Sequence, residues 1–148
     1  MAYEMPSSSD YTGLTRVVIA YTEAFAQLVG KAKAGMLTDA DWGAIEQLVD
    51  VSAFVREGVF LGPLAEVIDW PTYRSYVTQY GGFTSWEGTL RHVTETQGRV
   101  ILELEERNTR SGVTDVSRTV TIYEFNPSDK LRHLDVYVMP RAKQAPAR

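Results

Sequence analysis

The chain has 148 residues, of which 44% are apolar, and its formal net charge is −4. It contains no cysteine, which excludes disulfides, thiolate nucleophiles and cysteine-bound zinc. No basic cluster is large enough to neutralise a phosphate backbone and no apolar run could span a bilayer, so we expect neither nucleic acid nor a membrane as a partner. The N-terminus lacks the basic and apolar regions of a secretory signal, and we therefore expect a soluble, cytoplasmic protein.

Apolar residues at helical spacing dominate the first part of the chain. They predict a helix over residues 10–34, which Gly35 ends in a left-handed conformation. A second helix is expected over residues 38–50, with Thr38 as its N-cap. These two helices should supply much of the apolar surface that the rest of the chain covers.

A short strand and a third helix are expected next, over residues 53–60 and 69–80, with Asp69 as the N-cap of the helix. Alternating apolar and polar residues then predict four strands. These strands are expected over residues 84–96, 99–110, 114–126 and 131–139. Helices followed by a run of strands predict an α+β fold, with three helices packed in the concave face of a strongly curved, mainly antiparallel sheet.

A single domain is expected over residues 10–139, between a flexible N-terminus (1–9) and a flexible C-terminal tail (140–148). In the last strand, alternation puts Leu134 and Val136 on the face toward the helices. The opposite face of the sheet is partly apolar, which favours a homodimer through it. The apolar residues expected there are Ile101, Val120, Ile122, Tyr137 and Met139.

Residues 17–21 contain two valines followed three positions later by a tyrosine. Together with residues 44–57, 121–127 and 130–140, this stretch resembles the nuclear-transport-factor-two-like (NTF2-like) superfamily, which includes ketosteroid isomerases and SnoaL-like polyketide cyclases. The matching parts are the first helix, the second helix with its exit into the first strand, and the last hairpin. The resemblance implies a cone-shaped, cystatin-like fold with a pocket, and an enzyme that needs no cofactor.

Tyr21 and Glu57 are the candidate catalytic pair. Proton abstraction beside a carbonyl needs a carboxylate base in a poorly solvated pocket and a hydroxyl that holds the enolate oxygen. The resemblance gives these roles to Glu57 and Tyr21, although Glu57 stands where the family usually has aspartate. The residues alone leave two alternatives open: Tyr21 as a core tyrosine and Glu57 as a solvated residue at a strand end.

Aromatic residues crowd the middle of the chain, which suits an apolar pocket for a ring-shaped ligand. The same residues could equally fill a core. The expected pocket residues are Phe25, Phe54, Phe60, Trp70, Tyr76, Trp86, Thr121, Leu134 and Val136. Thr121 stands where the resemblance places a protonated aspartate of the isomerases.

Three further residues are secondary candidates. His133 and Asp135 could form a base with its orienting carboxylate, or an exposed or interfacial pair, and His92 is more typical of a structural histidine. No ligand spacing indicates a metal, and no cofactor motif is present. The sequence thus predicts a pocket protein acting by proton transfer on an apolar, ring-containing carbonyl compound, as an isomerase, cyclase or dehydratase. The alternative is a non-catalytic ligand-binding or protein-interaction module.

Overall fold

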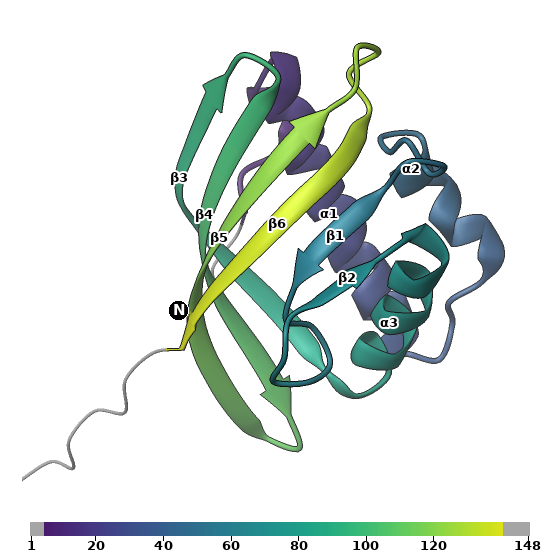
Figure 1. The fold of residues 1–148 in the computed structure, drawn as a ribbon. Helices are drawn as coiled ribbons and strands as arrows, with labels where there is room; N and C mark the ends of the chain where they lie inside the picture. Colours follow the sequence, from purple (N-terminus) through teal and green to yellow (C-terminus); the bar gives the residue numbers. More distant parts are fainter. Residues whose placement is uncertain (1–4, 141–148) are drawn as a thin grey trace, which may run out of the picture.

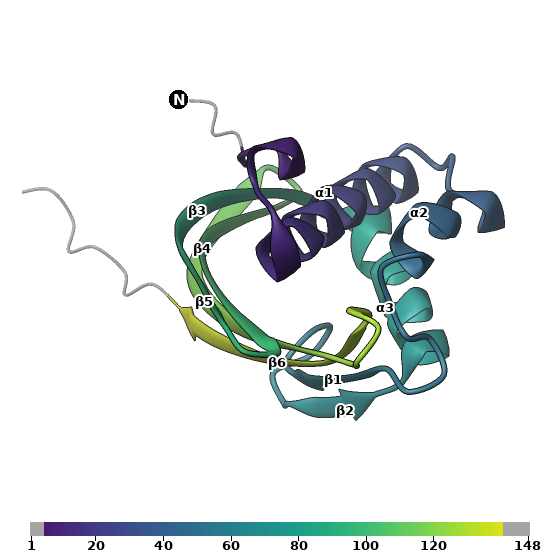
Figure 2. The same ribbon diagram turned by 90° about the horizontal axis from the view of Figure 1, so that it is seen from above.

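The computed structural model describes residues 5–140 as one curved sheet with helices against its concave face (Figures 1 and 2). The strands are β1 (Val55–Gly58), β2 (Glu66–Ile68), β3 (Ser85–Thr96), β4 (Arg99–Arg110), β5 (Val113–Phe125) and β6 (Leu131–Pro140). The helices are α1 (Gly13–Lys33), α2 (Gly43–Glu46) and α3 (Trp70–Phe83), with short 3₁₀-helices η1 (Ser8–Asp10) and η2 (Asp39–Trp42).

The six strands lie in the order β2-β1-β6-β5-β4-β3. All neighbouring strands are antiparallel except β1 and β6, which are parallel. The predicted α+β fold with a mainly antiparallel sheet is therefore confirmed. Within residues 5–140, no helix is long and apolar enough to cross a membrane.

The second helix is shorter than predicted. It is divided into η2 and α2 and ends at Glu46, whereas the sequence pattern predicted helix as far as residue 50. The backbone beyond it pairs with the start of β6 instead: the Leu131 N–H donates to the carbonyl of Leu48, and the Asp50 N–H donates to the carbonyl of Leu131. These long-range hydrogen bonds replace the helical ones, because each backbone group can be satisfied by either partner.

Helix α3 continues through Gly81 to Phe83, beyond the predicted end at residue 80, and Gly81 lies where α3 crosses α1 closely. Gly81 is buried against α1, and a Cβ atom there would lie 2.7 Å from Cβ of Ala32. The glycine therefore permits close packing of α1 on α3 rather than ending the helix. By contrast, Gly35 does follow α1 with a positive φ of 70°, as predicted.

Part of the segment predicted to be flexible at the N-terminus packs on the domain. The Ser8 backbone N–H donates to Oε1 of Glu23 at 2.5 Å, and the Ser8 hydroxyl donates to Oε2 at 3.1 Å. These bonds hold η1 against α1, so the ordered domain begins before residue 10. The predicted C-terminal tail lies outside the described residues from position 141 onward.

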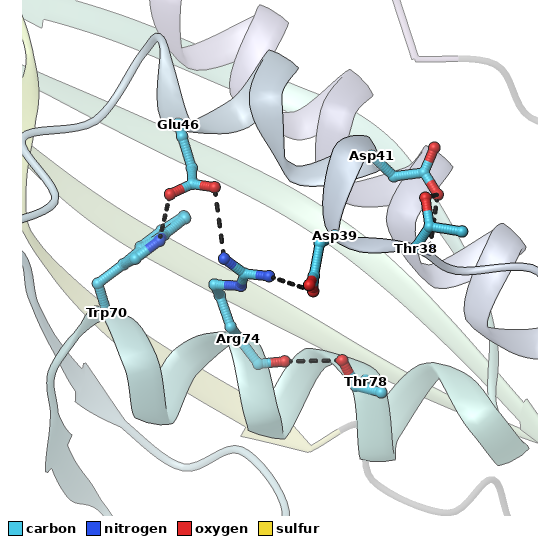
Figure 3. A network of polar contacts seen from close by, with 7 residues as sticks. All are labelled: Thr38, Asp39, Asp41, Glu46, Trp70, Arg74 and Thr78. Carbon is cyan, nitrogen blue, oxygen red and sulfur yellow. Dashed lines mark hydrogen bonds and ion pairs between the residues drawn. The ribbon is translucent and has the colours of Figure 1, made fainter.

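A network of polar contacts joins η2 and α2 to α3 (Figure 3). The Arg74 guanidinium lies 3.1 Å from Oδ1 of Asp39 and 3.5 Å from Oε1 of Glu46. Glu46 also accepts a hydrogen bond of 3.3 Å from Nε1 of Trp70. We refer to these four residues as the Arg74 network, and it fixes the helices that flank the concave face of the sheet.

Candidate functional site

A cavity of about 290 Å³ lies between the concave face of the sheet and helices α1 and α3. The strand residues that line it are spaced two apart, because alternate side chains of a strand point to the same face. On β4 they are Leu104, Glu106, Asn108 and Arg110, and on β5 they are Ser117, Thr119, Thr121 and Tyr123. Earlier on the same face of β4, Val100 and Leu102 are fully buried in the core. One strand face thus changes from core to polar cavity wall at Leu104.

Three tyrosines from different elements meet at the cavity. The Tyr21 hydroxyl of α1 donates to the Tyr73 hydroxyl of α3 at 2.5 Å, and the rings of Tyr21 and Tyr123 pack edge to face with centroids 5.9 Å apart. Burial raises the pKa of Tyr73 to about 12 and also raises the pKa values of Tyr21 and Tyr123. All three hydroxyls therefore stay protonated at neutral pH and can serve as hydrogen-bond donors.

Arg56 of β1 lines the same cavity and is only 9% exposed. Its guanidinium lies 4.5 Å from the ring centroid of Phe60 and donates to the backbone carbonyl of Val59 at 3.1 Å. No carboxylate in residues 5–140 forms an ion pair with it. Burial lowers the pKa of Arg56, yet a guanidinium remains charged at neutral pH.

Glu106 is the carboxylate in the cavity wall. Its Oε1 atom accepts a hydrogen bond of 2.5 Å from Nε1 of Trp86. Nearby on the same strand face, Asn108 accepts a hydrogen bond from the Tyr80 hydroxyl, and Nε of Arg110 donates to the Thr84 hydroxyl at 2.9 Å. The cavity therefore offers an acid–base group, hydroxyl donors and cations beside several aromatic rings.

Six of the nine expected pocket residues line this cavity. They are Phe25, Phe60, Trp86, Thr121, Leu134 and Val136. The other three lie elsewhere. Phe54 and Trp70 pack on each other in the core with ring centroids 4.9 Å apart. Tyr76 packs on the ring of Phe60 and donates from its hydroxyl to Glu66 at 2.7 Å.

The predicted catalytic pair is divided between the two faces of the sheet. Tyr21 lines the cavity, but Glu57 lies on the convex face with its side chain 50% exposed. The cause is the alternation of β1, in which Arg56 takes the inward position and Glu57 the outward one. The expectation that Tyr21 and Glu57 share one pocket is therefore wrong.

The secondary candidates also lie outside the cavity. His92 is exposed at an irregular position of β3. On the convex face, Nε2 of His133 lies 3.0 Å from Oδ1 of Asp135 and 3.7 Å from Oε1 of Glu57. One ligand atom from each of these three residues lies within 4.8 Å of the others, so this cluster could hold a metal ion.

Sequence reasoning missed the polar residues of the cavity, above all Arg56, Glu106 and Thr119. A signal for Glu106 was present in the alternation of β4, which continues inward from Leu104 to Glu106 and then to Asn108. Polar residues that continue the buried face of a strand indicate a cavity wall, because a solid core would leave them unsatisfied.

The sequence matches no family model and no curated protein. Solved structures, however, share its fold. One from Shewanella denitrificans OS-217, described as a SnoaL-like polyketide cyclase, superposes with a TM-score of 0.65 at 10% identity, over 85% of this chain and 90% of that chain. An NTF2-like protein from Anabaena variabilis ATCC 29413 gives a TM-score of 0.62 at 14% identity, over 95% and 96% of the two chains.

An LEH-like epoxide hydrolase from M. tuberculosis is also similar, with a TM-score of 0.53 at 12% identity over 80% of this chain and 84% of that chain. At these identities the similarity concerns the fold, which is the one that the short sequence motifs predicted. Helices on the concave face of a curved six-stranded sheet give the same architecture in this chain. The chain therefore has the fold of the NTF2-like superfamily.

Proposed function

We propose that the cavity binds a small, ring-containing carbonyl compound and catalyses proton transfer on it without a cofactor. The observation that carries this proposal is that Glu106 and the Tyr21–Tyr73 hydroxyl pair line one cavity together with several aromatic rings, among them Phe25, Phe60 and Trp86. Aromatic walls favour a flat ring, and a carboxylate with hydroxyl donors is the set that enolisation requires.

Glu106 would act as the base and Tyr73 as the donor to the carbonyl oxygen. The carboxylate removes a proton from the carbon beside the carbonyl, the C–H electrons form a carbon–carbon double bond, and the carbonyl oxygen becomes an enolate oxygen. Because Tyr73 accepts its hydrogen bond from Tyr21, its own proton remains available to that oxygen. Glu106 then returns the proton to the same carbon or to another, which regenerates the enzyme.

The solved structures of the same fold support chemistry on small molecules in such a cavity. Among them are proteins described as a SnoaL-like polyketide cyclase and an LEH-like epoxide hydrolase. Their names give a precedent for pocket enzymes on this fold, while the residues proposed here come from the geometry of this chain. The substrate class follows from the aromatic walls and the donor set.

Proton exchange in deuterated water tests the proposal. Bicyclic aromatic ketones such as α-tetralone are incubated with the protein, and loss of the proton signal beside the carbonyl is followed by NMR. We expect exchange above the buffer rate, with a loss of roughly 10²–10⁴-fold in Glu106→Gln. Glu103→Gln is the matched control, because Glu103 lies on the convex face of the same strand. Equal exchange by Glu106→Gln and the wild type would contradict the assignment of the base.

A non-catalytic binding module is the second candidate. It is favoured by the hydrogen bond from Trp86 to Glu106, which already occupies one oxygen of the proposed base. Binding of the same ketones without any exchange above the buffer rate would identify this module. Binding is measured by titration of tryptophan fluorescence, since Trp86 lines the cavity.

We also propose that the convex face forms a homodimer. Tyr137 and Met139 are 60% and 58% exposed on it, beside Ile122, which pairs with Ile101 across β4 and β5. Replacing Ile122 by glutamate should give monomers, because a charge would be buried in an apolar contact. Light scattering after size exclusion at micromolar concentration decides the matter, and a monomeric wild type would contradict the proposal.

A further inference from the structure

We infer that the compound bound in the cavity carries a singly charged oxyanion, such as a carboxylate, and that Arg56 binds this group. The inference rests on the proposed function of the cavity and specifies its ligand. It is drawn from three independent features: the charges that line the cavity, the unused donors of Arg56, and a buried hydroxyl that has no partner.

The charges lining the cavity do not balance. Two arginines, Arg56 and Arg110, and one carboxylate, Glu106, line it, while the tyrosines of the wall are neutral. One positive charge is therefore in excess, and of the two arginines Arg110 is exposed to solvent whereas Arg56 is buried. Arg56 forms no ion pair within residues 5–140, and Glu106 acts on it only over a longer distance, so an anionic group of a ligand beside Arg56 would stabilise its charge.

Arg56 has hydrogen-bond donors to spare. A guanidinium has five N–H donors, and those of Arg56 reach only the backbone carbonyls of Val59, at 3.1 Å, and Gly58, at 3.5 Å, within residues 5–140. The face of the guanidinium lies over Phe60, which leaves its edge for further hydrogen bonds. That edge matches the two oxygens of a carboxylate, since the donors of arginine form a planar fork.

Thr119 supplies the second, independent sign of a ligand. It is 4% exposed, it lines the cavity, and its hydroxyl has no hydrogen-bond partner among the described residues. Buried hydroxyls are nearly always hydrogen-bonded. An oxygen of a bound compound would satisfy this hydroxyl once the Thr119 side chain turns toward the cavity, because its own oxygen is almost wholly buried in the structure.

A matched acid and amide test the inference. Naphthoate and naphthamide with the same ring position have nearly the same size and differ in charge. Calorimetric titration at neutral pH should show that the acid binds about tenfold more tightly, because hydrogen bonds to a charged group are stronger than those to a neutral one. In Arg56→Gln the two affinities should become equal. Arg118→Gln, on the convex face of β5, is the control that keeps the preference.

Each outcome decides between the proposals. Equal affinity of the wild type for acid and amide would overturn the inference and leave the proposed function standing. Failure of both compounds to bind would overturn both. If the acid is still preferred in Arg56→Gln but no longer in Arg110→Gln, then Arg110 binds the anion, and the inference is overturned. If Arg56→Gln does not fold, Arg56→Lys replaces it, and loss of the two-donor fork should weaken naphthoate more than naphthamide.

Discussion

Arg74 and Arg56 have the same chemistry and opposite surroundings. Each guanidinium lies over an aromatic ring, at 4.8 Å from Trp42 for Arg74 and 4.5 Å from Phe60 for Arg56. Arg74 is partly exposed and has two carboxylate partners, whereas Arg56 is buried and has none in the described chain. In the Arg74 network the protein itself supplies the carboxylates that pair with the guanidinium, whereas in the cavity a ligand would have to supply one. This difference separates a structural contact from a binding site more clearly than residue type does.

The largest effect is expected at Tyr21. In Tyr21→Phe, Tyr73 loses its hydrogen-bond donor and the proposed enolate oxygen is less well stabilised, so ketone exchange should fall by roughly 10²–10³-fold. The free energy of unfolding should fall by only about 1 kcal/mol, the contribution of one hydrogen bond. Exchange measured by NMR and unfolding in urea give the two values.

Trp70→Phe is the matched change in the Arg74 network. It removes the hydrogen bond to Glu46 together with part of a buried ring, so the free energy of unfolding should fall by more than the ~1 kcal/mol of one hydrogen bond, whereas exchange should fall far less than in Tyr21→Phe. Equal exchange by Tyr21→Phe and the wild type would end the proton-transfer proposal.

Replacing either arginine by methionine should change the free energy of unfolding, but in opposite directions for the two residues. Arg56→Met removes a buried charge that forms no ion pair in the described chain and should raise the free energy of unfolding by about 1–2 kcal/mol. Arg74→Met removes two partly exposed ion pairs and should lower it by about 0.5–1 kcal/mol. Urea unfolding of both variants measures the difference. A clear loss of stability in Arg56→Met would indicate that Arg56 is a structural residue.

Two threonines allow a smaller comparison. Thr119→Val removes a buried hydroxyl that has no partner and should stabilise the protein by about 1 kcal/mol. Thr38→Val removes a hydroxyl that bonds Oδ2 of Asp41 at 3.0 Å and should destabilise it by about 0.5–1 kcal/mol. Thermal melting of the two variants is the measurement. Destabilisation by Thr119→Val would show that its hydroxyl is satisfied after all.

The fold was largely predictable because local patterns determine it. Alternation of period two located each end of the four long strands to within one residue, and Asp69 caps α3 by accepting a hydrogen bond of 3.0 Å from the Thr72 N–H, as predicted. The predicted bounds are wrong where contacts with residues distant in the sequence determine the local structure. The chain after Glu46 leaves the helix to pair with Leu131, and the pattern of residues 38–50 contains no information about that partner.

The site was harder to predict because one position in a strand decides which face a residue occupies. Arg56 and Glu57 are adjacent, and only the register of β1 against β6, in which Arg56 lies beside Leu134, places the arginine inward. The partner strand is far away in the sequence and parallel. The motif resemblance directed attention to Glu57, whereas the residue that enters the cavity is its neighbour.

The last prediction concerns how stability depends on pH, where different residues act in acid and in alkali. The carboxylate of Asp41 bonds Lys31 and the backbone N–H of Thr38, which lowers its pKa below 3.8. Its contribution to stability is thus present above pH 3.8 and is lost as the pH falls through the lowered value. Burial raises the pKa of Tyr73 from 10.0 to about 12, so its contribution is present below pH 10.0 and is lost as the pH rises through about 12.

Stability against pH should therefore fall on the acid side partly through Asp41, beside η2, and on the alkaline side partly through the cavity. Asp41→Asn should flatten the acid limb between neutral pH and strong acid and leave the alkaline limb unchanged, while Tyr73→Phe should do the reverse. Urea unfolding followed across the pH range tests both variants. An unchanged alkaline limb in Tyr73→Phe would mean that its hydroxyl is not held in the neutral form by burial, and the cavity would then be wetter than the structure indicates.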